Sequence, residues 1–164
     1  YHHIRLGING RLDTIQAAVL LAKLDIFESE VVSRQRAAAR YETLLADKAQ
    51  QGLLALPVVL SHNTSTWAQY TVRVKNRSLV QQSMTEAGIP TAVHYPTSLY
   101  RQPALKQSTI ECEQSDRAAN EVLSLPMHPY LTDEIQKQIA KCLSEAIDAS
   151  GASPSFSNKE NSVV

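Results

Sequence analysis

The 164-residue sequence has little of several features that mark whole classes of protein. It contains only two cysteines, Cys112 and Cys142, which cannot form a disulfide framework and are ordinary in a reducing compartment. It has no apolar run near the roughly 18 residues that a membrane-spanning helix needs, and its N-terminus has no signal-peptide pattern. These absences argue against membrane and secreted proteins and predict a cytoplasmic one.

An excess of charge of one sign is missing too, because 16 lysines and arginines balance 16 aspartates and glutamates. Nucleic acids and anionic membranes attract basic surfaces, so neither partner is expected. Hydrophobic residues make up 43% of the chain and charged residues 20%, which is ordinary globular composition. The length fits one domain, or two small ones.

Common catalytic motifs are absent as well. The five glycines do not cluster, so neither a G-x-x-x-x-G-K-[ST] phosphate loop nor G-x-G-x-x-G is present. There is no G-x-S-x-G, H-E-x-x-H or C-x-x-C sequence. His2 and His3 are adjacent, and neighbouring side chains on regular structure point apart, so we predict no metal site.

Glycine and proline are absent from Arg11 to Gln51, which predicts one long helical segment. Asp13 is a candidate N-cap, with Gln16 completing a capping box. An unbroken helix over residues 14–49 would be about 54 Å long, against about 40 Å for the diameter of a compact globule of this size. The helix must therefore break, with residues 25–28 the expected place, or protrude. Because residues 17–22 are apolar on every helical face, we expect another subunit or an upstream domain to cover them.

The rest of the sequence predicts an α+β fold, with helices covering one face of a mostly antiparallel sheet. The expected elements are an edge strand at 53–60, a strand at 66–74, a helix at 77–87, a short strand at 91–95, a helix from a Ser115 cap to Val122, a short strand at 123–125 and a helix after a Thr132 cap. Residues 1–50 would form a loop and a long helical arm, 51–149 a small domain, and 150–164, rich in polar residues, a disordered tail.

Three loops carry candidate chemistry. Residues 7–13 (GINGRLD) form either a turn before a helix cap or an anion site with Asn9 and Arg11 as donors beside the helix N-terminus. His94 and Tyr95, before Pro96, are either ordinary polar residues or groups that bind a sugar hydroxyl or phosphate. Residues 127–130 (MHPY) fit a rigid loop packed on the core.

Taken together, these loops resemble one family. Residues 7–18 (GINGRLDTIQAA) are similar to the signature of the DegT/DnrJ/EryC1/StrS group of pyridoxal-phosphate-dependent sugar-nucleotide aminotransferases. Residues 91–96 (TAVHYP), with Gln102 and Pro103 following, resemble its histidine-tyrosine-proline loop, and residues 123–131 (LSLPMHPYL) resemble its C-terminal segment. The resemblance extends over residues 1–148.

The resemblance implies the small C-terminal domain of a fold-type I aminotransferase, preceded by a long helical arm. A large domain would bind pyridoxal 5′-phosphate, and a homodimer would share its active sites. Because the chain opens at Tyr1 and none of its seven lysines follows the family's Ser-His-x-x-Lys pattern, we expect a fragment that lacks the Schiff-base lysine and is inactive alone. No catalytic residue is therefore assigned to this chain.

Carried over residue by residue, the resemblance implies that Asn9 contacts the cofactor phosphate of the neighbouring subunit. It likewise implies that Arg11 binds the acidic part of a nucleotide sugar. His94 and Tyr95 would line the substrate site. The implied reaction moves an amino group from glutamate to a keto-sugar nucleotide, with a UDP-linked 3-keto sugar or uronic acid for surface polysaccharide the nearest match. The alternatives are a catalytically dead remnant that acts at most as an interaction or dimerisation module, and an unrelated α+β binding domain.

Overall fold

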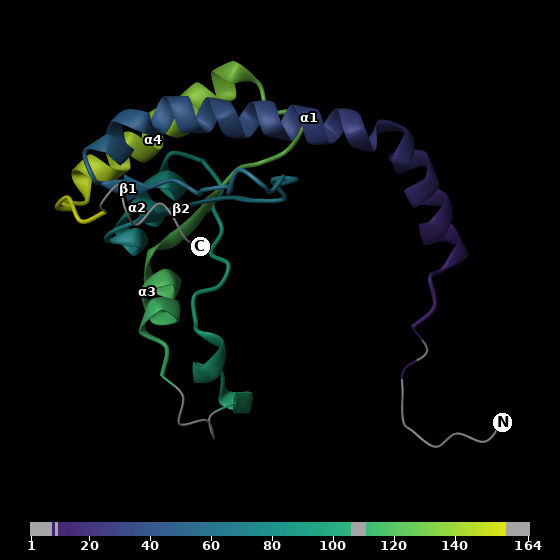
Figure 1. Cartoon of the computed structure of the whole chain (residues 1–164). Helices are drawn as coiled ribbons and strands as arrows, with labels where there is room; N and C mark the ends of the chain where they lie inside the picture. Colours follow the sequence, from purple (N-terminus) through teal and green to yellow (C-terminus); the bar gives the residue numbers. More distant parts are fainter. Residues whose placement is uncertain (1–7, 9, 106–110, 157–164) are drawn as a thin grey trace.

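The computed structural model describes residues 8, 10–105 and 111–156, and it consists of one long helix and a small mixed domain (Figure 1). In chain order the elements are α1 (Thr14–Gln50), β1 (Leu54–Ala55), β2 (Tyr70–Val74), α2 (Arg77–Glu86), the short 3-10 turns η1 (Leu99–Arg101) and η2 (Pro103–Leu105), α3 (Glu113–Glu121), β3 (Val122–Leu125) and α4 (Asp133–Ala149). Within the described residues, no helix is long and apolar enough to cross a membrane.

Helix α1 runs unbroken over 37 residues, so of the two expected outcomes it protrudes (Figure 1). Asp13 caps its start as predicted, because the Asp13 carboxylate accepts hydrogen bonds from the amides of Ile15 at 2.8 Å and Gln16 at 3.3 Å. Gly52 ends the helix in the left-handed region, at a φ of 69°. The Leu53 amide donates to the Lys48 carbonyl at 3.1 Å, the closing bond of a glycine-terminated helix.

The sheet is antiparallel throughout, in the order β1-β2-β3. The strand expected at 66–74 is present as β2, over its last five residues, and alternate residues of it, namely Tyr70, Val72 and Val74, are buried. The strand expected at 91–95 is wrong: that segment makes only a single bridge, between Ala92 and Ser124. Prolines lie on either side of it, and proline donates no ladder hydrogen bond.

Two other boundaries differ from expectation. Strand β1 has only two residues instead of the eight expected, because Pro57 follows it closely. Helix α3 begins at Glu113 with Cys112 as its N-cap, so Ser115 is not the cap. Its first turn carries Glu113 and Asp116, and negative side chains there are favoured by the helix dipole. The Thr132 cap of α4 is confirmed by its bond from the Ile135 amide.

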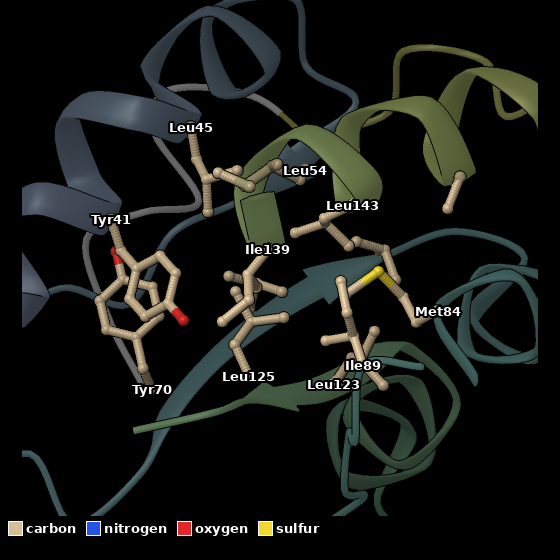
Figure 2. Packing of buried hydrophobic residues seen from close by; sticks show 14 of the residues in the cluster. Tyr41, Leu45, Leu54, Tyr70, Met84, Ile89, Leu123, Leu125, Ile139 and Leu143 are labelled. Carbon is tan, nitrogen blue, oxygen red and sulfur yellow. The ribbon is translucent and has the colours of Figure 1, made fainter. Parts of the chain in front are cut away.

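The core lies where α1, α2 and α4 meet one face of the sheet (Figure 2). Each element contributes apolar side chains to it: Tyr41 and Leu45 from α1, Leu54, Tyr70, Leu123 and Leu125 from the strands, Met84 from α2, and Ile139 and Leu143 from α4. Figure 2 shows the rings of Tyr41 and Tyr70 side by side, with centroids 4.9 Å apart. This packing anchors only the C-terminal half of α1.

Polar contacts add to that anchorage. The Arg40 guanidinium donates to Gln136 Oε1 at 2.5 Å and to the Leu131 carbonyl at 2.7 Å, and it pairs with Asp133. The buried Gln136 in turn donates to the Ala37 carbonyl at 2.8 Å. Because buried polar groups are costly when unpaired, this mutual pairing fixes α1 against the start of α4.

The first part of the C-terminal tail is docked on the domain. The amides of Ser155 and Phe156 donate to the Gly52 carbonyl at 2.9 and 3.1 Å. The Phe156 ring is only 6% exposed and lies beneath the Arg73 guanidinium and the Lys75 ammonium. Residues 150–156 therefore differ from the disordered tail that their composition predicted, and residues 157–164 lie outside the described part of the chain.

Candidate functional site

The first candidate group lies just before α1. Arg11 is exposed there, ahead of the Asp13 cap. The Asp13 carboxylate already occupies the Ile15 and Gln16 amides, so the first donors of the helix are satisfied within the chain. The predicted Asp13 cap is thereby confirmed, whereas the predicted turn before it involves Asn9 and stays a prediction. Asn9, the predicted cofactor contact, lies outside the described residues.

The second candidate group lies on the domain, in the loop between the Ala92–Ser124 bridge and η1. His94 and Tyr95 are joined by a cis peptide bond, and both side chains are exposed, Tyr95 by 75%. Their ring centroids are 5.7 Å apart and the rings meet edge to face. The loop thus presents an imidazole and a phenol together to solvent, as a binding surface would require.

His94 borders an open hollow of about 270 Å³ between this loop, the start of β2 and the segment after β3. Its other lining residues are small, apolar or uncharged: Ala68, Gln69, Pro90, Thr91, Ala92, Ser124, Leu125, Pro126 and Met127. Thr91 Oγ1 is buried and has no hydrogen-bond partner among the described residues. A buried hydroxyl without a partner is uncommon.

The loop beyond His94 and Tyr95 is held by Asp116, in the first turn of α3, which the sequence analysis did not single out. The Asp116 carboxylate accepts hydrogen bonds from Ser98 Oγ at 2.6 Å, from Arg101 Nη2 at 2.5 Å and from the Tyr100 hydroxyl. The bond from Arg101, supported by those from Ser98 and Tyr100, lowers the pKa of Asp116 to about 2. The only signal in the sequence was an aspartate near a helix start, which is too common to identify such an anchor.

The third loop, residues 127–130, packs against α1 as a rigid segment. The Met127 carbonyl accepts a hydrogen bond from Arg34 at 3.4 Å, and the Met127 side chain packs against the core. The Tyr130 hydroxyl donates to Glu30 Oε1 at 2.6 Å, and this bond raises the pKa of Tyr130. The expected structural role of this loop is confirmed, and Met127 also lines the hollow beside His94.

The structure does not bring the two candidate groups together. Arg11 precedes the projecting half of α1 (Figure 1), whereas His94 lies on the domain, beside a hollow that Met127 also lines. Met127 bonds to Arg34 near the middle of α1. Between Arg11 and that point the helix exposes large apolar side chains, and within the described part of the chain it is largely uncovered. A single copy therefore keeps the two candidate groups apart.

Two lysines beside the folded core are paired with carboxylates: Lys48 with Asp148 at 2.5 Å, and Lys75 with Glu121. No lysine lines the hollow beside His94. Among the residues described, no group of three or more histidines, cysteines or acidic residues is placed to hold a metal ion.

These features define a helix-extended α+β domain with an uncharged binding hollow. The chain belongs to the DegT/DnrJ/EryC1/StrS aminotransferase family, whose model matches residues 1–144. The resemblance carried by the three loops and the predicted fold class are thereby confirmed.

Individual relatives agree with this assignment. The chain is 50% identical over 143 residues to a UDP-2-acetamido-2-deoxy-3-oxo-D-glucuronate aminotransferase of Pseudomonas aeruginosa, a match that takes in 87% of this chain and 39% of that protein. The crystal structure of a family member from Brucella abortus superposes with a TM-score of 0.79 at 38% identity, over 88% of this chain and 38% of the other. A Bacillus subtilis structure with the cofactor PMP bound superposes with a TM-score of 0.77 at 25% identity, over 89% and 35% of the two chains. The chain thus spans well under half the length of the relatives it matches.

Proposed function

We propose that this chain works as the C-terminal part of a transaminase that moves an amino group from glutamate to a UDP-linked 3-keto sugar or uronic acid, for surface polysaccharide. The observation that carries the proposal is the 50% identity to the Pseudomonas aeruginosa enzyme, whose name specifies a 3-oxo uronate linked to UDP. The match takes in 87% of this chain, and the family model extends over residues 1–144, which include Arg11, His94 and Tyr95.

Within this function, His94 and Tyr95 would contact the sugar at the hollow. Hydroxyl and amide groups of a sugar are uncharged and bond both donors and acceptors, which matches the uncharged lining of the hollow and its polar Gln69 and Ser124. The exposed Tyr95 ring offers a surface on which a ring can stack. The role of this loop would therefore be to bind and orient the substrate.

Arg11 would bind the acidic part of the nucleotide sugar, and Asn9 the cofactor phosphate of the neighbouring subunit. A guanidinium forms paired, charge-assisted bonds to phosphate or carboxylate oxygens. Because Arg11 precedes the projecting half of α1 and His94 lies on the domain in one copy, the arrangement supports a homodimer in which each subunit lends its Arg11 loop to the other. The exposed apolar side chains of α1 would then be covered in the assembly.

Pyridoxal phosphate supplies the electron sink that such amino transfer requires. No lysine lines the hollow beside His94, and in this proposal the covalent lysine and most of the phosphate contacts would belong to a large domain joined to this chain or supplied separately. The 164 residues by themselves would be inactive. The alternative is a catalytically dead remnant that acts at most as a dimerisation module.

A chimera distinguishes the two. The matching stretch of the Pseudomonas aeruginosa enzyme would be replaced by this chain, and amination of that enzyme's own keto substrate would be measured with glutamate as donor. We expect activity, and we expect Arg11→Ala to raise KM for the nucleotide sugar by about tenfold or more, as loss of a charge-assisted contact would. Arg36→Ala is the matched control, because Arg36 is exposed on α1 and, among the described residues, its recorded hydrogen bond is to Ser33 in the same helix.

A chimera that takes up pyridoxal phosphate stoichiometrically but aminates nothing would favour the remnant. Equal KM values for the Arg11→Ala and Arg36→Ala variants would refute the role given to Arg11.

A further inference from the structure

The loop that carries His94 and Tyr95 is held at two points, one on each side. Upstream, Ala92 exchanges backbone hydrogen bonds with Ser124 at 3.1 and 2.8 Å, which ties the loop to β3. Downstream, Ser98 is buried and its hydroxyl bonds to the Asp116 carboxylate on α3 at 2.6 Å. Only five residues separate the two anchors, and one of them is Pro96, whose ring fixes its own φ.

The side chains of His94 and Tyr95 contribute little to their own placement. Among the described residues, their recorded contact is the edge-to-face meeting of the two rings, and both side chains face solvent. Their positions are therefore set by the backbone, and the backbone is set by its two anchors.

The downstream anchor depends on one carboxylate. Asp116 accepts from Ser98, from the Tyr100 hydroxyl and from the Arg101 guanidinium, so three residues of the loop converge on it. Arg101 Nε also bonds to the Tyr100 oxygen at 3.0 Å, and its guanidinium lies 5.4 Å from the centre of the Tyr100 ring. Because all three loop groups donate to it, replacing the carboxylate by an amide removes its negative charge and one of its two accepting oxygens, and puts a donor in that place.

We propose that Asp116 is a positioning residue for substrate binding: it fixes Ser98 and so holds His94 at the border of the hollow, with Tyr95 next to it in the loop. This inference rests on the proposed function, because it assumes that the hollow binds the sugar. Helix α3 does not line the hollow itself. Under this proposal it would affect substrate recognition indirectly, through the bonds that Asp116 makes to the loop.

The structural part is tested on the 164-residue chain alone by amide hydrogen exchange. The amides of Arg101 and Gln102 bond to the Ser98 and Leu99 carbonyls and report on the anchored turn. We expect Asp116→Asn to speed their exchange by about tenfold or more, since charge-assisted bonds are the strong ones. Asp133→Asn is the matched control, because Asp133 is also an arginine-paired carboxylate in the first turn of a helix, far from the loop.

Ser98→Ala and Tyr100→Phe remove single donors and serve if Asp116→Asn does not fold. Each should speed exchange less than Asp116→Asn does, and Ser98→Ala should add almost nothing in the Asp116→Asn background, because the two groups share one bond. Unchanged exchange at Arg101 and Gln102 in every one of these variants would overturn the proposal.

The positioning part is tested in the chimera described above, with the keto substrate of the Pseudomonas aeruginosa enzyme. We expect Asp116→Asn to raise KM for the nucleotide sugar about fivefold or more with kcat within about twofold, because the variant loses orientation of a binding loop and not a reacting group. Faster exchange with an unchanged KM would leave Asp116 a structural residue only and would overturn its positioning role. A wild-type chimera without activity would instead count against the proposed function, while the exchange result would still decide whether Asp116 holds the loop.

Discussion

The two halves of α1 have the same backbone conformation and opposite surroundings. From Thr14 to Ser29 almost every side chain is exposed, including large apolar ones such as Leu21, at 66%. From Glu30 to Gln50 the helix buries Tyr41 and Leu45 completely and is fastened to α4. Figure 1 shows the division: one half lies along the domain and the other projects from it.

This difference separates two causes of helix formation that usually act together: the local sequence and packing against the rest of the protein. The projecting half is helical because the sequence from Arg11 to Gln51 has no glycine or proline and Asp13 caps its start, although no neighbouring element packs against most of it. Helices in ordinary proteins gain most of their stability from packing, and isolated helices are only marginally stable in water. The projecting half therefore depends on the folded half as its nucleus, and its apolar residues mark a surface suited to contact with another folded unit.

The largest expected effect comes from making the same substitution in each half. Leu45→Ala empties a fully buried site and should lower the free energy of unfolding by about 2–5 kcal/mol. Leu21→Ala removes an exposed side chain and should change it by no more than about 0.5 kcal/mol. Urea unfolding of the 164-residue chain at low concentration measures both, and a cost above about 1 kcal/mol for Leu21→Ala would show that the projecting half is packed in solution.

The next effect concerns association. We expect the 164-residue chain to associate through the apolar side chains between Ile15 and Phe27, because their exposed surface gains by leaving water. Leu24→Glu should weaken that association by at least about tenfold, since it places a charge in the contact. Leu79→Glu is the control, because Leu79 on α2 is similarly exposed, at 54% against 62% for Leu24.

Sedimentation velocity over a concentration series distinguishes the variants. A chain that stays monomeric at all concentrations, or equal weakening by Leu24→Glu and Leu79→Glu, would show that the projecting half is not an association surface.

The same contrast explains how far the sequence could predict the fold. Signals that act within a few residues were sufficient: the Asp13 and Thr132 caps, the glycine after α1, and the alternation of Tyr70, Val72 and Val74. Features that depend on residues far away in the sequence could not be predicted in this way. Phe156 is buried because its ring meets Arg73 and Lys75, and nothing in the composition of the tail announces that contact.

The residues of the candidate site show the same distinction between local and distant signals. His94 and Tyr95 could be found because they stand together in a short loop motif, and the structure places them beside a hollow. Asp116 could not, because its importance arises only when Ser98, Tyr100 and Arg101 fold back onto α3 from earlier in the chain. A residue that accepts hydrogen bonds from several distant side chains has no recognisable pattern in the sequence around it.

The smallest expected effect lies at the boundary between the two halves. The Tyr130 hydroxyl donates to Glu30 at the last point where the domain contacts α1, so Tyr130→Phe should let the helix fray further, with amide exchange over residues 26–33 faster by about two- to fivefold. Residues 41–50 of the same helix serve as the internal control and should not change.

High pH should have the same effect on the wild-type chain, because the bond needs a protonated phenol. The bond raises the pKa of Tyr130, so the contact is intact below the ordinary tyrosine value of about 10 and is lost as the pH rises through the raised value. After correction for the intrinsic pH dependence of exchange, protection over residues 26–33 should fall in the wild type above that pH and stay flat in Tyr130→Phe. A parallel fall in both would place the boundary elsewhere, at Arg34, whose guanidinium bonds to the Trp67 and Met127 carbonyls one turn further along the helix.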